Sequence, residues 1–168
     1  MIEHKSLRFS TNPEKAASKV AINSFMIGSL FFILTLVWTL SPEKFGIVIV
    51  SELILAIPFL FVSSLAYSKI GYWKETKHWD IFAWYTNNVG NIFVLNVVGL
   101  IAGAMYRNIA FTYFALIILL MAIYTSINIF AHKKVYQNVL FKEKLFKFFF
   151  FVLVLFLGGI FPLYLKII

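Results

Sequence analysis

The chain contains no cysteine and few charged side chains. Of its 168 residues, 13% are charged and 61% are hydrophobic, whereas a soluble domain carries roughly a quarter of its residues as charged side chains. Such a sequence cannot cover a water-facing surface. The missing cysteines exclude a disulfide scaffold, thiol nucleophiles and thiolate metal sites, and the apolar composition excludes a disordered chain. The composition therefore predicts an all-α, polytopic integral membrane protein.

Five apolar runs are long enough to cross a bilayer. About 20 mostly apolar residues in a helix span the roughly 30 Å of hydrocarbon. The runs cover residues 20–40, 45–66, 81–105, 109–131 and 146–165. They leave too little chain for a soluble domain, so residues 1–168 are predicted to form a single transmembrane helical bundle.

Two polar segments beside these runs also carry helix signals. Residues Thr11 to Glu14 have the form of a capping box with a proline at the first helical position. They predict a helix that begins near Pro13 and includes residues 13–19 as a cytoplasmic extension of the first span. Residues 132–145 mix lysines with apolar residues, which fits either an interfacial amphipathic helix or a short hydrated loop.

The basic residues alternate between the two ends of the predicted spans. Twelve of the fifteen lysines and arginines lie in the N-terminal tail, the second loop or the fourth loop. Because lysine and arginine are enriched in cytoplasmic loops, five spans predict a cytoplasmic N-terminus and an external C-terminus. The same rule explains the net charge of +8 without a nucleic acid as partner. We expect a multi-pass protein of a prokaryotic plasma membrane, with anionic headgroups at its cytoplasmic face.

One carboxylate lies inside a predicted span. Glu52 is in the run 45–66, and no lysine or arginine within a span is placed to pair with it. An ionisable group in hydrocarbon costs a few kcal/mol or more and usually faces the bundle interior or water. Its face continues at helical spacing through Ala56, Phe59 and Ser63. Glu52 is therefore predicted to face other helices, either protonated, hydrogen-bonded by neutral donors or open to a water-filled cavity.

The third span, 81–105, is unusually rich in amide side chains. Its asparagines are Asn87, Asn88, Asn91 and Asn96. Each brings two donors and an acceptor that need partners in hydrocarbon. Gly99 and Gly103 form a GxxxG pair on the same side, and small residues at that spacing let another helix approach closely. These features predict a central position for this span.

Further polar residues extend this pattern across the predicted bundle. With Glu52 and the four asparagines, they are Thr35, Ser63 and Tyr124. If their helix faces converge, these residues line a polar track from one side of the membrane to the other. The alternative for the hydroxyl and amide residues taken singly is interhelical hydrogen bonding, worth about 0.6 kcal/mol each on average.

Catalytic chemistry has little support in the sequence. His78, Asp80 and His132 fall at the predicted cytoplasmic interface, and two histidines with a carboxylate can ligate zinc or iron. Their spacing matches no known ligand motif, however. We therefore assign no catalytic residue, expect no cofactor and no metal, and lean toward a protein that is not an enzyme.

Three functions fit these observations. The first is a small transport or channel-like binding module that handles a cation, a proton or a small polar solute along the polar track. The second is a non-catalytic accessory subunit of a larger membrane complex. The third is an integral membrane enzyme that acts on lipid headgroups at the cytoplasmic interface. Because five helices make a thin bundle, the first also predicts a homo-oligomer or a membrane partner protein.

Overall fold

The computed structural model describes residues 11–40, 45–70, 76–132 and 137–167, and these residues are almost entirely helical. The elements are α1 (Pro13–Leu40), α2 (Ile47–Ile70), α3 (Lys77–Met105), α4 (Arg107–His132), α5 (Gln137–Leu155), the π-helical turn η3 (Phe156–Ile160) and α6 (Phe161–Leu165). Five helical stretches are long and apolar enough to span a membrane, the fifth running from α5 through η3 into α6. The all-helical class and the five candidate spans are thereby confirmed.

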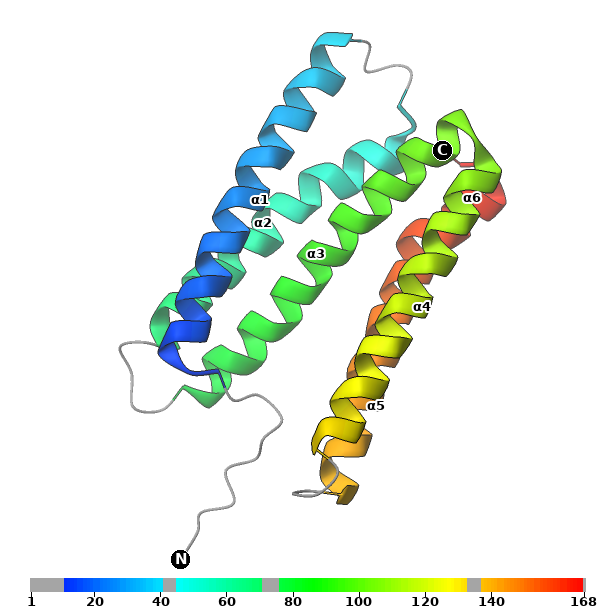
Figure 1. Cartoon of the computed structure of the whole chain (residues 1–168). Coiled ribbons are helices and arrows are strands. Elements are labelled where there is room, and N and C mark those ends of the chain that lie inside the picture. Colours follow the sequence, from blue (N-terminus) through cyan, green and yellow to red (C-terminus); the bar gives the residue numbers. More distant parts are fainter. Residues whose placement is uncertain (1–10, 41–44, 71–75, 133–136, 168) are drawn as a thin grey trace, which may run out of the picture.

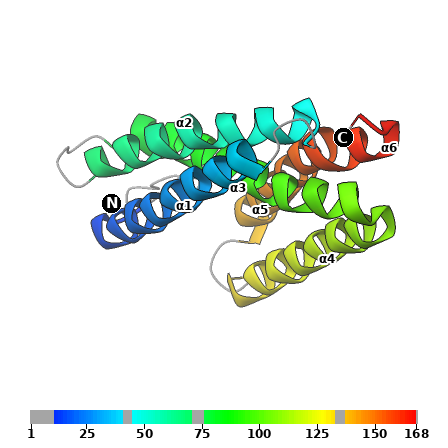
Figure 2. The ribbon, with the colours of Figure 1, turned by 90° about the horizontal axis from the view of Figure 1, so that it is seen from above.

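The helices run alternately up and down beside one another (Figure 1). α1 packs on α2, and α2 packs along α3. On its other side α3 contacts α4, α5 and η3, so that it joins the two parts of the bundle. Figure 2 shows α4 on the opposite side of α3 from α2. This central position agrees with the one predicted for the asparagine-rich span.

The core is apolar and draws on every long helix. Fully buried side chains fill its larger part, among them Leu30, Leu53, Leu60, Ile92, Leu100, Phe114, Leu155 and Leu163. A smaller cluster at the other end of the bundle joins Ala16 to Ala66, Tyr67, Ile70 and Ala83. Large apolar side chains also cover the outside: Phe25 is 77% exposed, and Leu119 and Leu153 are each 56% exposed. Apolar residues on both the inside and the outside are typical of a helical bundle in lipid.

The first helix begins where the sequence predicts but is capped by a different residue. α1 starts at Pro13, and the Asn12 Oδ1 accepts a hydrogen bond from the Lys15 N–H at 2.8 Å, as an N-cap does. The prediction of a capping box led by Thr11 is wrong. Thr11 instead donates its backbone N–H and its hydroxyl to the Asp80 carboxylate, at 2.9 and 2.6 Å. This contact ties the start of α1 to the start of α3.

Several helices extend beyond the apolar runs that predict them. α2 continues to Ile70 and α3 begins at Lys77, because lysine and other polar residues are compatible with a helix even where the apolar run has ended. From Gln137 onward, the amphipathic segment predicted at 132–145 belongs to α5 and continues into the fifth span. The first residue of that segment, His132, ends α4, and residues 133–136 lie outside the described residues.

Candidate functional site

Glu52 of α2 and Asn96 of α3 meet inside the bundle. The Glu52 side chain is 7% exposed and Asn96 is fully buried. The Asn96 Nδ2 donates a hydrogen bond of 3.2 Å to the Glu52 Oε1. Glu52 lies five residues after the start of α2 and Asn96 lies nine residues before the end of α3. At 1.5 Å per residue, the pair is therefore about 7–14 Å from the same end of the bundle.

A third element, the π-helical turn η3, closes the site. A Cβ atom built on Gly158 would overlap the Glu52 Oε1 and the Asn96 Nδ2. A Cβ atom on Gly159 would lie 2.6 Å from the Asn96 Oδ1 and would also overlap the Phe114 ring. The glycine backbone therefore packs directly on the carboxylate and the amide. No other residue fits at either position without displacing the pair.

The π-helical turn also leaves a backbone carbonyl without its usual donor. The Phe161 N–H donates to the Phe156 carbonyl, five residues earlier, rather than to the residue four earlier. The next residue, Pro162, has no N–H. The carbonyl of Leu157 or Gly158, which that N–H would have reached, therefore receives no bond from it. Single π turns of this kind are frequent at functional sites.

Two oxygen atoms at the site have no hydrogen-bond partner among the described residues. They are the Glu52 Oε2 and the Asn96 Oδ1, and both are buried. A buried polar atom without a partner costs about 1–3 kcal/mol, and more when it carries charge. In the sequence, Glu52 is followed by Leu53 and Asn96 is followed by Val97. Both of these residues are buried members of the apolar core. The two oxygens therefore remain unsatisfied by the residues that the structure describes.

A second polar cluster joins the other part of the bundle. The Asn23 Nδ2 donates to the Leu60 carbonyl and to the Ser63 Oγ, each at 3.4 Å. The Ser63 Oγ donates to the Ala83 carbonyl at 3.2 Å. This chain links α1, α2 and α3, as expected of interhelical hydrogen bonds. Ser63 is eleven residues from Glu52, or about 16 Å along the helix, so the cluster is separate from the Glu52 site.

The other residues of the predicted polar track are not gathered at Glu52. The Asn88 Nδ2 donates to the Trp84 carbonyl of its own helix at 2.6 Å. Asn87 is buried with its Oδ1 unpartnered, and Asn91 is half-buried. Thr35 and Tyr124 are exposed on the outside of the bundle, and the Thr35 hydroxyl donates to the Phe31 carbonyl of its own helix. Of the predicted track, the structure thus brings together Glu52 and Asn96.

The glycines of the GxxxG pair differ in their surroundings. A Cβ atom on Gly99 would overlap the ring of Phe114, so Gly99 lets α4 of the same chain approach α3 closely. Gly103 is half-buried near the end of α3. The close approach at Gly99 places Phe114 beside Gly159 as well, and the ring thereby seals one side of the Glu52 site.

The histidines do not gather into a metal site in the part of the chain that the structure describes. His78 is exposed, and both carboxylate oxygens of Asp80 accept hydrogen bonds from Thr11. The side chain of His132 lies outside the described residues. Among the residues that are described, no group of three histidine, aspartate or glutamate side chains could hold a metal ion. Asp80 therefore ties two helices together, which gives the headgroup enzyme no support.

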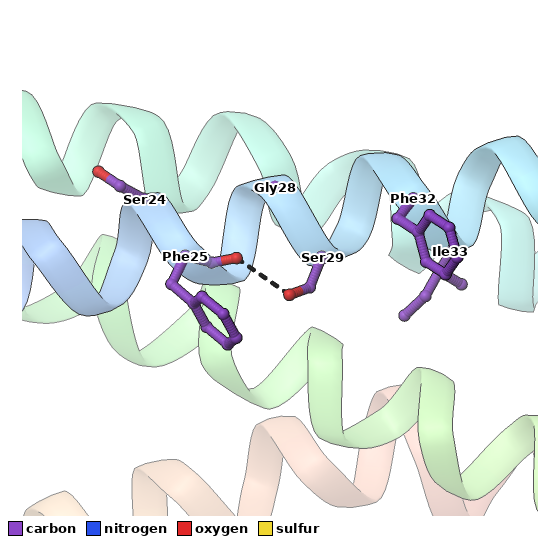
Figure 3. A pocket seen from close by; sticks show the side chains of 6 residues that line it. All are labelled: Ser24, Phe25, Gly28, Ser29, Phe32 and Ile33. Carbon is purple, nitrogen blue, oxygen red and sulfur yellow. Dashed lines mark hydrogen bonds between the residues drawn. The ribbon is translucent and has the colours of Figure 1, made fainter.

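An open groove runs along the outer face of α1. It has a volume of about 550 Å³ and is lined by Ser24, Phe25, Gly28, Ser29, Phe32 and Ile33. Figure 3 shows these residues along the helix and the hydrogen bond of 3.0 Å from the Ser29 hydroxyl to the Phe25 carbonyl. A Cβ atom on Gly28 would meet nothing within 4 Å. The groove does not include Glu52 or Asn96.

The sequence predicted that Glu52 and Asn96 face other helices but did not indicate the glycines that pack on them. The pattern Gly158-Gly159, followed by Pro162 inside an apolar run, is the signal that could have revealed an irregular helical turn. Asn23, the single asparagine in the first span, was also missed. No known protein family, curated protein or solved structure matches this chain.

Proposed function

We propose that this protein is a membrane-embedded binding or transport module that handles a proton or a small cation at Glu52. The observation that carries the proposal is a buried carboxylate whose second oxygen has no partner. Glu52 has one hydrogen-bond partner, the Asn96 amide, and no ion-pair partner among the described residues. An isolated carboxylate in an apolar interior binds a positive species, because its charge is otherwise very costly.

The position of the site favours a carrier-like module over an open channel. Glu52 lies about 7.5 Å along α2 from the helix start at Ile47, so a small opening at that end would admit water. Toward the other end, the next polar cluster is the one formed by Asn23 and Ser63, and its hydrogen bonds serve helix contacts. Uptake and release at Glu52 through a change in helix packing therefore fit the geometry better than continuous flow.

Flux through liposomes tests the proposal. The purified chain would be reconstituted with a pH-sensitive dye inside the vesicles, and an imposed proton or sodium gradient would be followed over time. Glu52→Gln keeps the shape of the side chain but removes its ability to bind a positive charge, so we expect at least a tenfold loss of flux. Thr35→Val is the matched control, because Thr35 is exposed and bonded to its own helix. Equal flux in wild type and Glu52→Gln would refute the proposal.

A second candidate function, an accessory subunit of a membrane complex, has support of its own. The groove on α1 has small residues at Ser24, Gly28 and Ser29, with open space over Gly28, and small residues favour close contact between membrane helices. This function predicts that a membrane partner co-purifies with the chain and is lost in Gly28→Leu, while Glu52→Gln keeps it. Co-purification that Gly28→Leu leaves unchanged would count against it.

A further inference from the structure

The two unpartnered oxygens of the site belong to a carboxyl group and a primary amide, two groups that can share one hydrogen atom. The Asn96 Nδ2 already donates to the Glu52 Oε1 at 3.2 Å. The atoms left over are the other carboxyl oxygen, Oε2, and the amide oxygen, Oδ1. A carboxylic acid and a primary amide can pair through two hydrogen bonds, N–H to the acid carbonyl and acid O–H to the amide carbonyl. The leftover atoms are those of the second bond.

We infer that the species bound at Glu52 is a proton, held as a carboxylic acid that pairs through two hydrogen bonds with the Asn96 amide. This inference rests on the proposed function of the same site and names its ligand. In the closed site the Oε2–H donates to the Asn96 Oδ1. When water enters, the O–H bond breaks and the proton passes to a water molecule as hydronium. The carboxylate that remains keeps the bond from Asn96 Nδ2, and rebinding a proton reverses the step.

The surroundings of the pair favour a proton over a metal ion. Hard cations such as Ca²⁺ take about six to eight oxygen ligands. Here the Asn96 nitrogen, a donor, points at one carboxyl oxygen. The backbone of Gly158 and Gly159 occupies the space next to that oxygen and next to the amide. The side-chain oxygens of the pair are the two of Glu52 and one of Asn96, so a metal ion would remain under-coordinated.

No charged group among the described residues is placed to replace the proton. Between Lys19 and Leu40, α1 has no titratable side chain, and from Ile47 to Ala66 α2 has Glu52 alone. On the α4 side, the Tyr113 hydroxyl donates to the Leu95 carbonyl, and the Arg107 guanidinium donates to the Tyr164 carbonyl. The remaining titratable side chains that the structure describes at this end are Tyr106, Tyr164 and Lys166, which are exposed. A proton is thus the simplest species that would neutralise the Glu52 carboxylate.

Infrared spectroscopy of the full chain in lipid vesicles measures this proton directly. A protonated carboxyl group has a carbonyl stretch separate from that of a carboxylate, and it shifts in deuterated water. At neutral pH we expect one such band that is absent in Glu52→Gln. Asn96→Leu removes the amide partner and should shift the band to higher frequency. Asn88→Leu is the matched control on the same helix, because Asn88 bonds its own backbone, and should leave the band in place.

The absence of a protonated band in wild type, or a band that Asn96→Leu does not move, would overturn the inference. A wild-type measurement covers the case in which a variant does not fold. Dicyclohexylcarbodiimide modifies protonated carboxyl groups in apolar surroundings, and mass spectrometry locates the adduct. Modification of Glu52 that sodium ions do not slow supports the inference. Protection by sodium, or no modification, counts against it.

The failure of this inference can be told apart from the failure of the proposed function. Wild-type vesicles are compared with Glu52→Gln for retention of radioactive sodium. If wild type retains about one ion per chain and Glu52→Gln retains none, then the bound species is a cation instead of a proton and the proposed function stands. A protonated band together with flux that Glu52→Gln does not change would leave this inference standing and refute the proposed function. Glu52 would then hold a proton without transporting one.

Discussion

Replacing Gly158 by alanine should disrupt the Glu52 site from the side of η3. The new Cβ atom would fall on the Glu52 Oε1 and the Asn96 Nδ2. The added methyl group must displace these two side-chain ends, which are buried and lie on two different helices. Either the hydrogen bond between them breaks or the π turn moves away from α2 and α3.

The cost can be worked out from the separate contributions. Overpacking a close-packed interior costs about 1–3 kcal/mol, and loss of the buried hydrogen bond to a carboxyl group adds about 1–3 kcal/mol. Alanine recovers about 1 kcal/mol of helix propensity. The free energy of unfolding should therefore fall by roughly 1–5 kcal/mol. For a chain of this size, that corresponds to a drop in Tm of about 2–4 °C for each kcal/mol.

Gly28→Ala is the matched control, because a Cβ atom there meets nothing within 4 Å. It gains the same helix propensity without the overlap, so its Tm should stay equal to that of wild type or rise slightly. Both variants would be unfolded thermally in the same detergent or lipid, followed by circular dichroism. If Gly158→Ala proves as stable as Gly28→Ala, then η3 does not pack on the Glu52–Asn96 pair and the site as described is wrong.

Two further predictions concern the buried polar residues outside this turn. Asn23→Leu should change the free energy of unfolding by less than about 1 kcal/mol, because the two bonds of its Nδ2 are long and its Oδ1 has no partner among the described residues. Asn96→Leu should lower the free energy of unfolding further, since it leaves Glu52 without a donor. Thermal melts of the two variants measure this difference, and equal losses would contradict the ranking. Asp80→Asn should weaken the two bonds from Thr11 and so speed proteolysis near the start of α1, whereas Glu14→Gln, at an exposed position, should not. Limited digestion followed by mass spectrometry measures the cleavage. Unchanged cleavage in Asp80→Asn would show that Thr11 does not hold the helix start.

The predicted spans agree closely with the helices because hydropathy is a local property. A run of about 20 apolar residues has few alternatives to a helix, since every backbone polar group must be satisfied within the segment. The predicted ends of the spans were less accurate than their positions. α2 and α3 continue through polar residues to Ile70 and from Lys77, and the hydropathy of the runs contains no signal for these turns. At the start of α1, both Thr11 and Asn12 can cap a helix, and Asp80, 69 residues later, decides between them.

The composition and order of the residues determined by themselves that the chain is helical and apolar, and that a carboxylate and several asparagines lie within its long apolar helices. They also indicated that Glu52 and Asn96 need partners. Only the tertiary structure decided that these two are partners of each other, that Asn88 bonds its own helix and that Thr35 lies outside. The reason is physical: a sequence defines the direction of a side chain on its own helix, whereas the rotation and register of one helix against another depend on packing. At this site the packing depends on Gly158 and Gly159, whose missing side chains let η3 reach the pair.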